Sequence, residues 1–371
     1  MIQYKDLNLK KSQDLHTKIY FDLYNLIASA GYNIGDRIST ELSLATQYNV
    51  SRPTIHKAVK KLQDEGYLES KAGSGTRIIL KPHSNESSLV FGLLFPFRWN
   101  MEGLFNPLSQ EIASLSTSHD FQIVWGGKFP KRFTSSQDLD RMADFYINQK
   151  VSGVFLAPVE LTADCMKSTD RIAQRLTEAN IPIILIDADF QPFPSSSNFD
   201  FVGIDNYRAA YHLTEHFIKK GETRVDFCSN PFSGETVQLR LKGVKGALMD
   251  HGITPSSEWI HTINEDKKDF GKELKKKGAR NIICSNDWVA IRLIKMLQEE
   301  SYLVPKDFRL AGFDNSVFSQ NINPQITSID QHCHDLAALA VKAMLNRIKD
   351  PSSPTLRLFS NFSLKERAST L

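Results

Sequence analysis

The sequence predicts two parts of different fold class: a small α+β domain over residues 1–80 and a larger α/β domain with two parallel sheets over residues 89–371. Three observations support this division. The 371 residues exceed the usual size of one domain. Residues 1–80 contain three helical patterns and then a β-prone pair, whereas strand-like apolar runs alternate with helical patterns after residue 88. Residues 81–88 are polar, contain one proline and show no periodicity, which is typical of a linker.

The N-terminal elements follow from apolar spacing and capping residues. Apolar side chains recur at three- and four-residue steps, and Ser39 and Ser51 precede helical patterns as caps. Pro53 stands in the first turn of the third helix, where its missing N–H costs little. The β-prone pair that follows has a glycine tip, so the layout is that of a winged helix-turn-helix. The expected helices and hairpin cover residues 12–30, 40–48, 51–66 and 67–80.

In the larger part short apolar runs alternate with helical patterns, in about ten units. Strands that are buried on both faces have this character, and βα repetition predicts parallel sheets with helices outside. Ten units are more than one sheet comfortably holds. The Pro- and Ser-rich stretch 191–198 is the expected boundary between two lobes.

Composition and charge narrow the class of protein. With 41% hydrophobic and 23% charged residues the chain is ordinary globular material. Residues 1–85 hold 12 basic and 8 acidic side chains against 33 and 34 in the remainder, which suggests a polyanionic partner for the N-terminal part only. We expect no membrane span and a cytoplasmic location, because the apolar runs are short and the N-terminus lacks a signal-peptide pattern.

The third helix has the character of a DNA-reading helix. Ile55, Val59 and Leu62 form an apolar stripe, and the opposite side is small, basic and able to form hydrogen bonds. Such a front suits the major groove, where N-terminal helix residues reach base edges and lysines meet phosphates. The guanidinium group of Arg52 can donate two hydrogen bonds at once, to guanine or to two phosphate oxygens. The alternative is an exposed amphipathic helix whose charges are merely solvated.

The order of motifs favours DNA binding. Residues 18–80 resemble the winged-helix domain of the GntR family of bacterial regulators, in GYNIGDRISTE (31–41), VSRPTI (50–55), LQDEGYL (62–68) and GSGT (73–76). The resemblance implies DNA contacts from the start of the third helix and from the wing. The sequence departs from the family pattern at Leu42, Pro53 and His56, so a different base preference is expected. The candidate DNA-contacting residues are Arg37, Ser51, Arg52, Thr54, His56, Lys57, Lys71, Gly73 and Gly75.

Polar residues end several apolar runs of the larger part. Asp187, Asn230, Asn286 and Asp314 each follow a predicted strand, and the carboxyl ends of parallel strands are where such sheets bind ligands. Carboxylate and amide groups can bind hydroxyls, and an aromatic such as Phe232 can cover an apolar ring face. Each of these polar residues could equally cap the helix that follows it.

A second resemblance assigns a ligand-binding role to several of these positions. Residues 89 to about 350 look like the effector domain of LacI-type regulators, a periplasmic-binding-protein-like fold; the motifs are GIDN (203–206), NPFS (230–233), RLKG (240–243), SND (285–287), VPKD (304–307), AGFD (311–314) and NPQITSI (323–329). By that resemblance Asp187, Arg240, Asn286 and Asp314 line the effector site, with Phe232 on its wall. Arg240 could clamp two ligand oxygens at once, unless it is a surface arginine on a helix.

A metal motif competes with this interpretation. His212, Glu215 and His216 match the H-x-x-E-H pattern of inverted zinc proteases, in which two histidines hold zinc and the glutamate is the general base. No third ligand can be identified, and short motifs often match by accident. We therefore expect a structural role for the motif, no cofactor and no enzymatic activity, while a zinc hydrolase remains the alternative.

The two resemblances together predict a ligand-responsive transcription regulator of the arabinose-repressor type. It would bind double-stranded operator DNA as a homodimer and respond to a small polar effector, a sugar by expectation. Repression relieved by effector is the default, although effector-promoted binding is compatible with the same sequence. A solute-binding protein without a regulatory role is a further alternative, which the DNA-binding part argues against.

Overall fold

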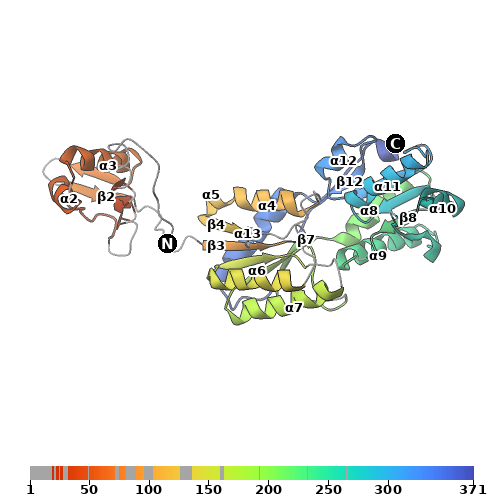
Figure 1. The fold of residues 1–371 in the computed structure, drawn as a ribbon, viewed down its shortest axis with the longest axis horizontal. Coiled ribbons are helices and arrows are strands. Elements are labelled where there is room, and N and C mark those ends of the chain that lie inside the picture. Colours follow the sequence, from red (N-terminus) through yellow and green to blue (C-terminus); the bar gives the residue numbers. More distant parts are fainter. Residues whose placement is uncertain are drawn as a thin grey trace. The chain divides into compact units, whose positions relative to one another are not determined.

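The computed structural model divides into two compact units, Met1–Ser88 and Leu89–Leu371, which we call the head and the body (Figure 1). The expected linker 81–88, Gly73 and Phe232 lie outside the described residues. Among the described residues, no helix is both long and apolar enough to cross a membrane. The structure describes residues 19–20, 22–24, 26–27, 32–48, 50–71, 75–80, 89–95, 103–125, 136–158, 163–191, 193–231, 233–264 and 266–371.

The head has the predicted winged helix-turn-helix layout. The described residues between 19 and 27 are helical and are followed by α2 (Glu41–Gln47) and α3 (Arg52–Asp64). The antiparallel strands β1 (Leu68–Lys71) and β2 (Gly75–Ile78) form the wing hairpin. The apolar stripe of α3 is buried as predicted and packs in one core. That core includes Ile19, Leu23, Ile27, Leu44, Ile55, Ala58, Val59, Leu62, Leu68 and Ile78.

Capping of the head helices differs from prediction at both Ser39 and Ser51. Ser39 does not cap α2; Thr40, one residue later, has the extended backbone of an N-cap and accepts a hydrogen bond from the Ser43 N–H at 3.2 Å. Ser51 is the N-cap of α3 by backbone, but its hydroxyl lies 2.8 Å from the Thr54 hydroxyl and makes no cap bond. In the first turn of α3 the Thr54 N–H instead donates to the Ser51 carbonyl at 3.0 Å, and Pro53 has no N–H to satisfy.

The first lobe of the body is a six-stranded parallel sheet in the order β13-β7-β6-β5-β3-β4. Its strands are β3 (Leu89–Leu94), β4 (Phe121–Trp125), β5 (Gly153–Leu156), β6 (Ile183–Ile186), β7 (Asp200–Ile204) and β13 (Arg357–Ser360). Its helices are α4 (Phe105–Ser114), α5 (Ser116–His119), α6 (Ser136–Asn148), α7 (Ala163–Glu178) and α13 (Cys333–Lys349). The predicted parallel architecture is confirmed in this lobe.

The second lobe is a six-stranded sheet in the order β14-β12-β11-β10-β8-β9, parallel except for β14. Its strands are β8 (Asp226–Ser229), β9 (Ile260–Thr262), β10 (Asn281–Cys284), β11 (Arg309–Phe313), β12 (Thr327–Asp330) and β14 (Ser363–Lys365). Its helices are α8 (Asn206–Ile218), α9 (Glu235–Asp250), α10 (Phe270–Lys276), α11 (Asp287–Glu299) and α12 (Val317–Asn321), with short 3₁₀ turns η1 (Ser257–Trp259) and η2 (Ala368–Thr370).

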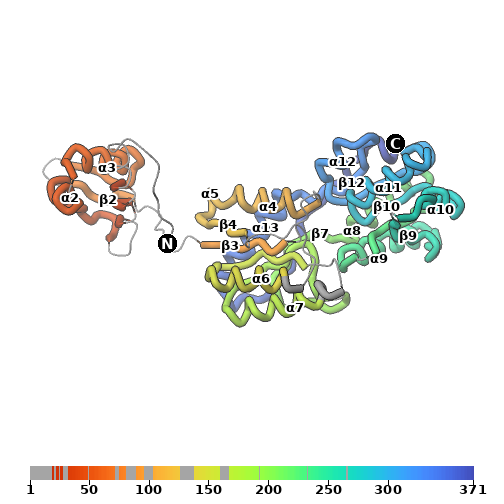
Figure 2. The backbone as a smooth tube through the Cα atoms, viewed as in Figure 1, coloured from red at the N-terminus to blue at the C-terminus, as the bar shows by residue number. Residues whose placement is uncertain are grey.

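The expected lobe boundary at residues 191–198 is wrong. Strand β7 follows that stretch yet pairs with β6 of the first lobe, with Ile184 opposite Asp200. The chain crosses to the second lobe after β7, returns after β12 to form α13 and β13, and crosses again to β14. In Figure 2 the blue tube of α13 accordingly runs among orange and green segments of the first lobe. Local patterns cannot reveal such crossings, because each strand is equally apolar in either sheet.

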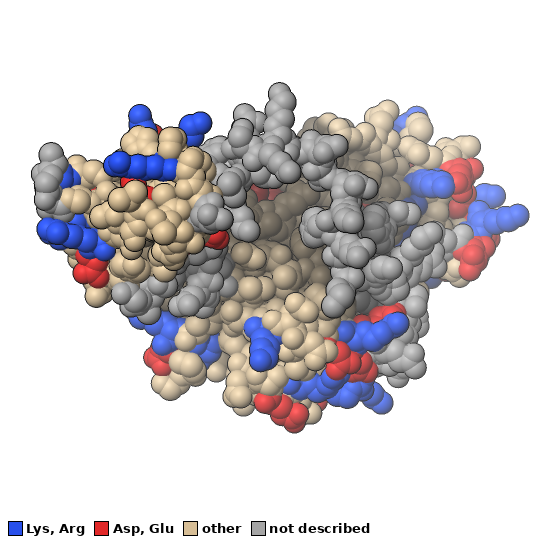
Figure 3. All heavy atoms as spheres, turned by 60° about the vertical axis from the view of Figure 1, so that its left-hand side comes forward, with Lys and Arg blue, Asp and Glu red and all other residues tan. Residues whose placement is uncertain are grey.

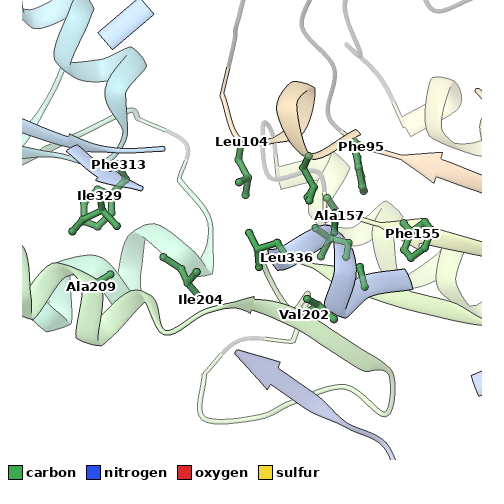
Figure 4. Packing of buried hydrophobic residues seen from close by; sticks show 14 of the residues in the cluster. Phe95, Leu104, Phe155, Ala157, Val202, Ile204, Ala209, Phe313, Ile329 and Leu336 are labelled. Atoms are coloured by element: carbon green, nitrogen blue, oxygen red, sulfur yellow. The ribbon is translucent and has the colours of Figure 1, made fainter. Parts of the chain in front are cut away.

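The largest hydrophobic cluster has members in both lobes. Figure 4 shows Leu104, Leu336 and Ala157 gathered in the first lobe, and Phe313 and Ile329 gathered at the strand ends of the second. All five side chains are almost fully buried. Each lobe is therefore firmly packed up to the edge where its strands end.

Candidate functional site

Two predicted DNA-contacting residues on the exposed side of α3 share one acidic partner, Glu41. Arg52 and His56 lie one turn apart with side chains 68% and 58% exposed. The Arg52 Nε lies 3.7 Å from Glu41 Oε2, and the His56 Nδ1 lies 2.8 Å from Glu41 Oε1. Glu41 begins α2, so its carboxylate joins both helices of the helix-turn-helix. Sequence reasoning missed Glu41, because an acidic residue is not expected beside a polyanion.

A hollow of about 600 Å³ connects this helix to the wing. Near it the Gln63 Nε2 donates to Ser70 Oγ at 2.5 Å, and the hydroxyls of Ser70 and Thr76 lie 2.7 Å apart. Polar side chains thus fasten α3 to both wing strands. The hollow is lined by Glu41, Arg52, Pro53, His56, Gln63 and Ser70.

The remaining candidates of the head divide between helix and wing. Ser51, Thr54 and Lys57 lie with Arg52 in the first turns of α3. Arg37 forms an isolated bridge with Arg77, whose Nη1 donates to the Gly35 carbonyl at 2.7 Å. Gly75 lies beside Arg37 in a left-handed conformation, φ +78°, and the Lys71 Nζ lies 3.3 Å from Glu69 Oε2. On the side of the molecule that Figure 3 shows, Lys and Arg side chains lie among Asp and Glu side chains.

In the body, Asp187, Arg240 and Asp314 come together where strands of both lobes end. Asp187 follows β6 and Asp314 follows β11, with φ of +70° and +102°, a region that aspartate tolerates better than most residues. Burial raises the pKa of Asp187, and the Arg240 guanidinium acts in the opposite direction. Burial likewise raises the pKa of Asp314 to about 7, against the effect of Arg240 and with the help of the neighbouring carboxylates. We call this group the crevice.

Arg240 is the buried centre of the crevice and only 4% exposed, which excludes the surface-arginine alternative. Its Nε donates to Asn206 Oδ1 at 2.7 Å, and its Nη1 donates to the Ser285 carbonyl at 2.6 Å. The guanidinium carbon lies 4.3 Å from the centre of the Phe313 ring, a cation–π contact. These three partners hold the guanidinium group in one orientation, and its charge acts on the carboxylates of Asp187 and Asp314.

Two buried acceptor atoms, one in the crevice and one on a residue bonded to it, have no hydrogen-bond donor among the described residues. One is Asp187 Oδ1 and the other is Gln331 Oε1. The Gln331 Nε2 donates to Asp314 Oδ1 at 2.7 Å, so its amide is oriented with the oxygen left over. A buried unpaired acceptor is costly, which marks both atoms as positions for a donor from a ligand. Gln331, 1% exposed, carried no motif that sequence reasoning could use.

The other predicted residues of the body have structural roles. Asn286 caps α11: its Oδ1 accepts from the Val289 N–H at 3.0 Å, so the capping alternative is realised there. Asn230 Oδ1 accepts from Arg292 Nη1 at 2.9 Å. Asp287 is buried beneath the crevice, where its Oδ1 accepts from the Ser328 hydroxyl at 2.7 Å, and burial raises its pKa to about 6.

A cavity of about 460 Å³ opens beside Asp314, between α4 of the first lobe and α12 of the second. Gly103 faces Asp314 across it: a Cβ at Gly103 would lie 3.7 Å from Asp314 Oδ2. The His334 Nδ1 lies 3.0 Å from Glu111 Oε2, and this contact raises the pKa of His334. The volume is in the range of small-molecule sites, and most of the residues that line it are of polar type.

The H-x-x-E-H motif does not gather metal ligands. His216 is buried, with its Nε2 2.9 Å from the Thr370 hydroxyl and its Nδ1 3.5 Å from Glu366 Oε1. His212 instead packs edge-on against the Phe362 ring. Among the described parts of the chain, no three His, Cys, Asp or Glu side chains could hold a metal ion together. The motif therefore serves to pack α8 against the C-terminal segment.

Comparisons with known proteins agree with both halves of the architecture. Residues 15–78 match the family described as "Bacterial regulatory proteins, gntR family", and residues 214–370 match the "Periplasmic binding protein-like domain". The "Arabinose metabolism transcriptional repressor" of Halalkalibacterium halodurans is 23% identical over 332 residues, 84% of either chain.

Solved structures with the same fold are regulators as well. The transcription regulator CcpA of Lactococcus lactis superposes with a TM-score of 0.65 at 19% identity, over 77% of this chain and all of that one. A LacI family transcriptional regulator from Enterococcus faecium, solved with bound ribose, gives 0.61 at 22% identity, over 76% and 98%. At these identities the superpositions establish the bilobal fold, which confirms the predicted fold class.

Proposed function

We propose that this chain, a DNA-binding transcription regulator that joins a gntR-type head to a periplasmic-binding-protein-like body, represses its target genes and is released from operator DNA by a sugar. Its class of function, predicted from the sequence, is confirmed by the two family matches and by the repressor relatives. The effector, the direction of its effect and the residues that bind it belong to the proposal.

The observation that carries the sugar assignment is the set of unpaired acceptors around Arg240. Asp187 Oδ1 and Gln331 Oε1 need donors, and the anchored guanidinium is itself a donor. A polyhydroxyl ligand supplies the missing donors and also an acceptor for Arg240, because each hydroxyl can donate to a carboxylate and accept from a guanidinium. A relative named for arabinose metabolism and a ribose-bound structure of the same fold support this chemistry.

The mechanism uses the two-lobed body as a switch. A sugar held by Asp187 of the first lobe and by Arg240 and Asp314 at the second makes contacts that only one lobe arrangement completes, so it favours that arrangement by its differential affinity. We infer that the protein acts in the cytoplasm as a homodimer, whose two heads occupy half-sites of a near-palindromic operator. Binding and release need no cofactor or catalytic step.

The experiment uses operator sequences selected from a random DNA pool by the purified protein. Fluorescence anisotropy then follows DNA binding while arabinose, ribose and other monosaccharides are titrated. One of them should release the DNA from the wild type, whereas Arg240→Lys should need a concentration at least tenfold higher, because it loses a charge-assisted hydrogen bond. The exposed Arg141→Lys serves as the matched control. Failure to select any DNA sequence, or release at equal concentrations from both variants, would refute the proposal.

A further inference from the structure

The positive charge of the body is concentrated in one segment. Residues 266–280 hold seven Lys and Arg side chains and three Asp and Glu, whereas the rest of the body after residue 85 holds 26 basic and 31 acidic side chains. The segment contains α10 and lies in the second lobe, outside the DNA-reading head. Its net charge equals that of the whole of residues 1–85.

Two acidic groups packed against α10, Glu273 and Glu300, are already engaged. Glu273 is held by Lys267 at 2.5 Å and by Lys277 at 2.9 Å, which lowers its pKa to about 2. Glu300 accepts from the backbone N–H groups of Gly271 and Lys272 at 2.6 and 2.9 Å and so closes the N-terminus of the helix. The segment's other two carboxylates, Asp266 and Asp269, are exposed, so its seven basic side chains still outnumber its acidic ones.

Four exposed cations lie on α10 or within a few residues of its ends. In the described part of the chain, Lys268, Lys272, Lys276 and Arg280 are exposed and have no carboxylate within ion-pair distance. Lys272 and Lys276 lie one helical turn apart, so they point the same way. The apolar residues of α10 are buried in the lobe. The outer face is thus basic without an exposed apolar centre; we call these four residues the α10 patch.

We propose that the α10 patch is a second DNA contact, which binds backbone phosphates without sequence preference. Protein–protein interfaces are centred on buried aromatic and apolar anchors and are depleted in lysine, so this face does not fit a protein partner well. Lysine is a flexible point charge, and several lysines on one face suit a line of phosphates. A regulator held at its operator by the head meets such phosphates at high local concentration.

The test compares full-length Lys272→Gln/Lys276→Gln with a matched control, Lys342→Gln/Lys349→Gln, which removes two exposed lysines of α13. Binding is measured against salt on an operator-free duplex of about 200 base pairs and on an operator duplex of about 20. Each lost phosphate contact lowers the slope of log affinity against log salt by about 0.9. On the long duplex we therefore expect a slope lower by one to two, and a severalfold weaker affinity, for the patch variant only.

Equal slopes for the patch variant, the control and the wild type on the long duplex would overturn the proposal. So would a patch variant that binds long DNA normally but no longer binds a polyglutamate peptide, because the partner would then be an acidic protein. Operator binding on the short duplex reports the head separately, so a failure of the proposed repressor function is distinguishable from a failure of the patch.

Discussion

Asp314→Asn should make the body more stable at neutral pH. The side chain is half-buried near Asp187 and Asp287, and one guanidinium serves the crevice, so desolvation and the neighbouring carboxylates raise its pKa to about 7. Asparagine keeps the shape, can accept the Gln331 amide bond at the same oxygen, and tolerates the left-handed backbone. It removes the charge and places an amide nitrogen where one carboxylate oxygen was.

The magnitude follows from the raised pKa. An aspartate ionises near 3.9 in the unfolded chain and near 7 here, so folding is increasingly penalised as pH rises between these values and the penalty is constant above them. At about 1.4 kcal/mol per pH unit the full penalty is roughly 4 kcal/mol, of which about 2.3 develops between pH 5 and 7, because the group is half ionised in the folded chain at pH 7. Asp187, whose pKa is also raised, acts in the same direction.

The assay is urea unfolding followed by tryptophan fluorescence. All four tryptophans, Trp99, Trp125, Trp259 and Trp288, lie in the body, so the head does not contribute. The stability advantage of Asp314→Asn over the wild type should grow by about 2–3 kcal/mol from pH 5 to pH 7.

Asp120→Asn provides the control for this series, because Asp120 is exposed and also has a left-handed backbone, φ +50°. It should follow the wild type at every pH. An Asp314→Asn variant that shows the wild-type pH profile, or that is less stable at pH 8, would refute the buried-carboxylate argument. The same variant should bind its sugar more weakly, since it trades ligand contacts for stability.

Three further sets of substitutions test the DNA contacts of the head, the H-x-x-E-H motif and a buried ion pair. Arg52→Ala should weaken specific operator binding by about 1–3 kcal/mol, whereas Lys57→Ala should mainly lower its salt dependence; operator affinity equal to wild type in the Arg52 variant would contradict this. His212→Ala should leave DNA binding and sugar response unchanged, and elemental analysis that finds one zinc per chain would overturn that expectation. Arg347→Ala strips the buried Asp200 carboxylate of bonds at 2.8 and 3.0 Å, so calorimetry should show a loss of about 3–5 kcal/mol rather than a wild-type transition.

Local patterns were sufficient for the head. The stripe of Ile55, Val59 and Leu62 identified both the helix and its buried face, because helical periodicity is a property of neighbouring residues. The cap of α2 was misplaced by one residue, from Thr40 to Ser39, since either hydroxyl satisfies the sequence rule and only the backbone angles decide between them.

Much of the crevice was also predictable, because polar residues at the ends of apolar runs collect at one edge of a parallel sheet. Asp187 and Asp314 do meet there, and Arg240, which the second resemblance indicated rather than this rule, joins them from α9. Asn286 shows the limit of this rule: a polar residue after a strand also precedes a helix, and here it caps that helix. Sequence alone left the two roles equally open.

The amino-acid sequence by itself determined the two fold classes, the reading helix and the residues at the strand ends, since all of these depend on periodicity and residue type. Only the tertiary structure decided that β7 belongs to the first lobe, that Arg240 is anchored on Asn206 and Ser285, and that Gln331 presents an unpaired oxygen. The physical reason is that strand order, desolvation and hydrogen-bond partnership depend on residues far apart in the chain, which local spacing does not encode.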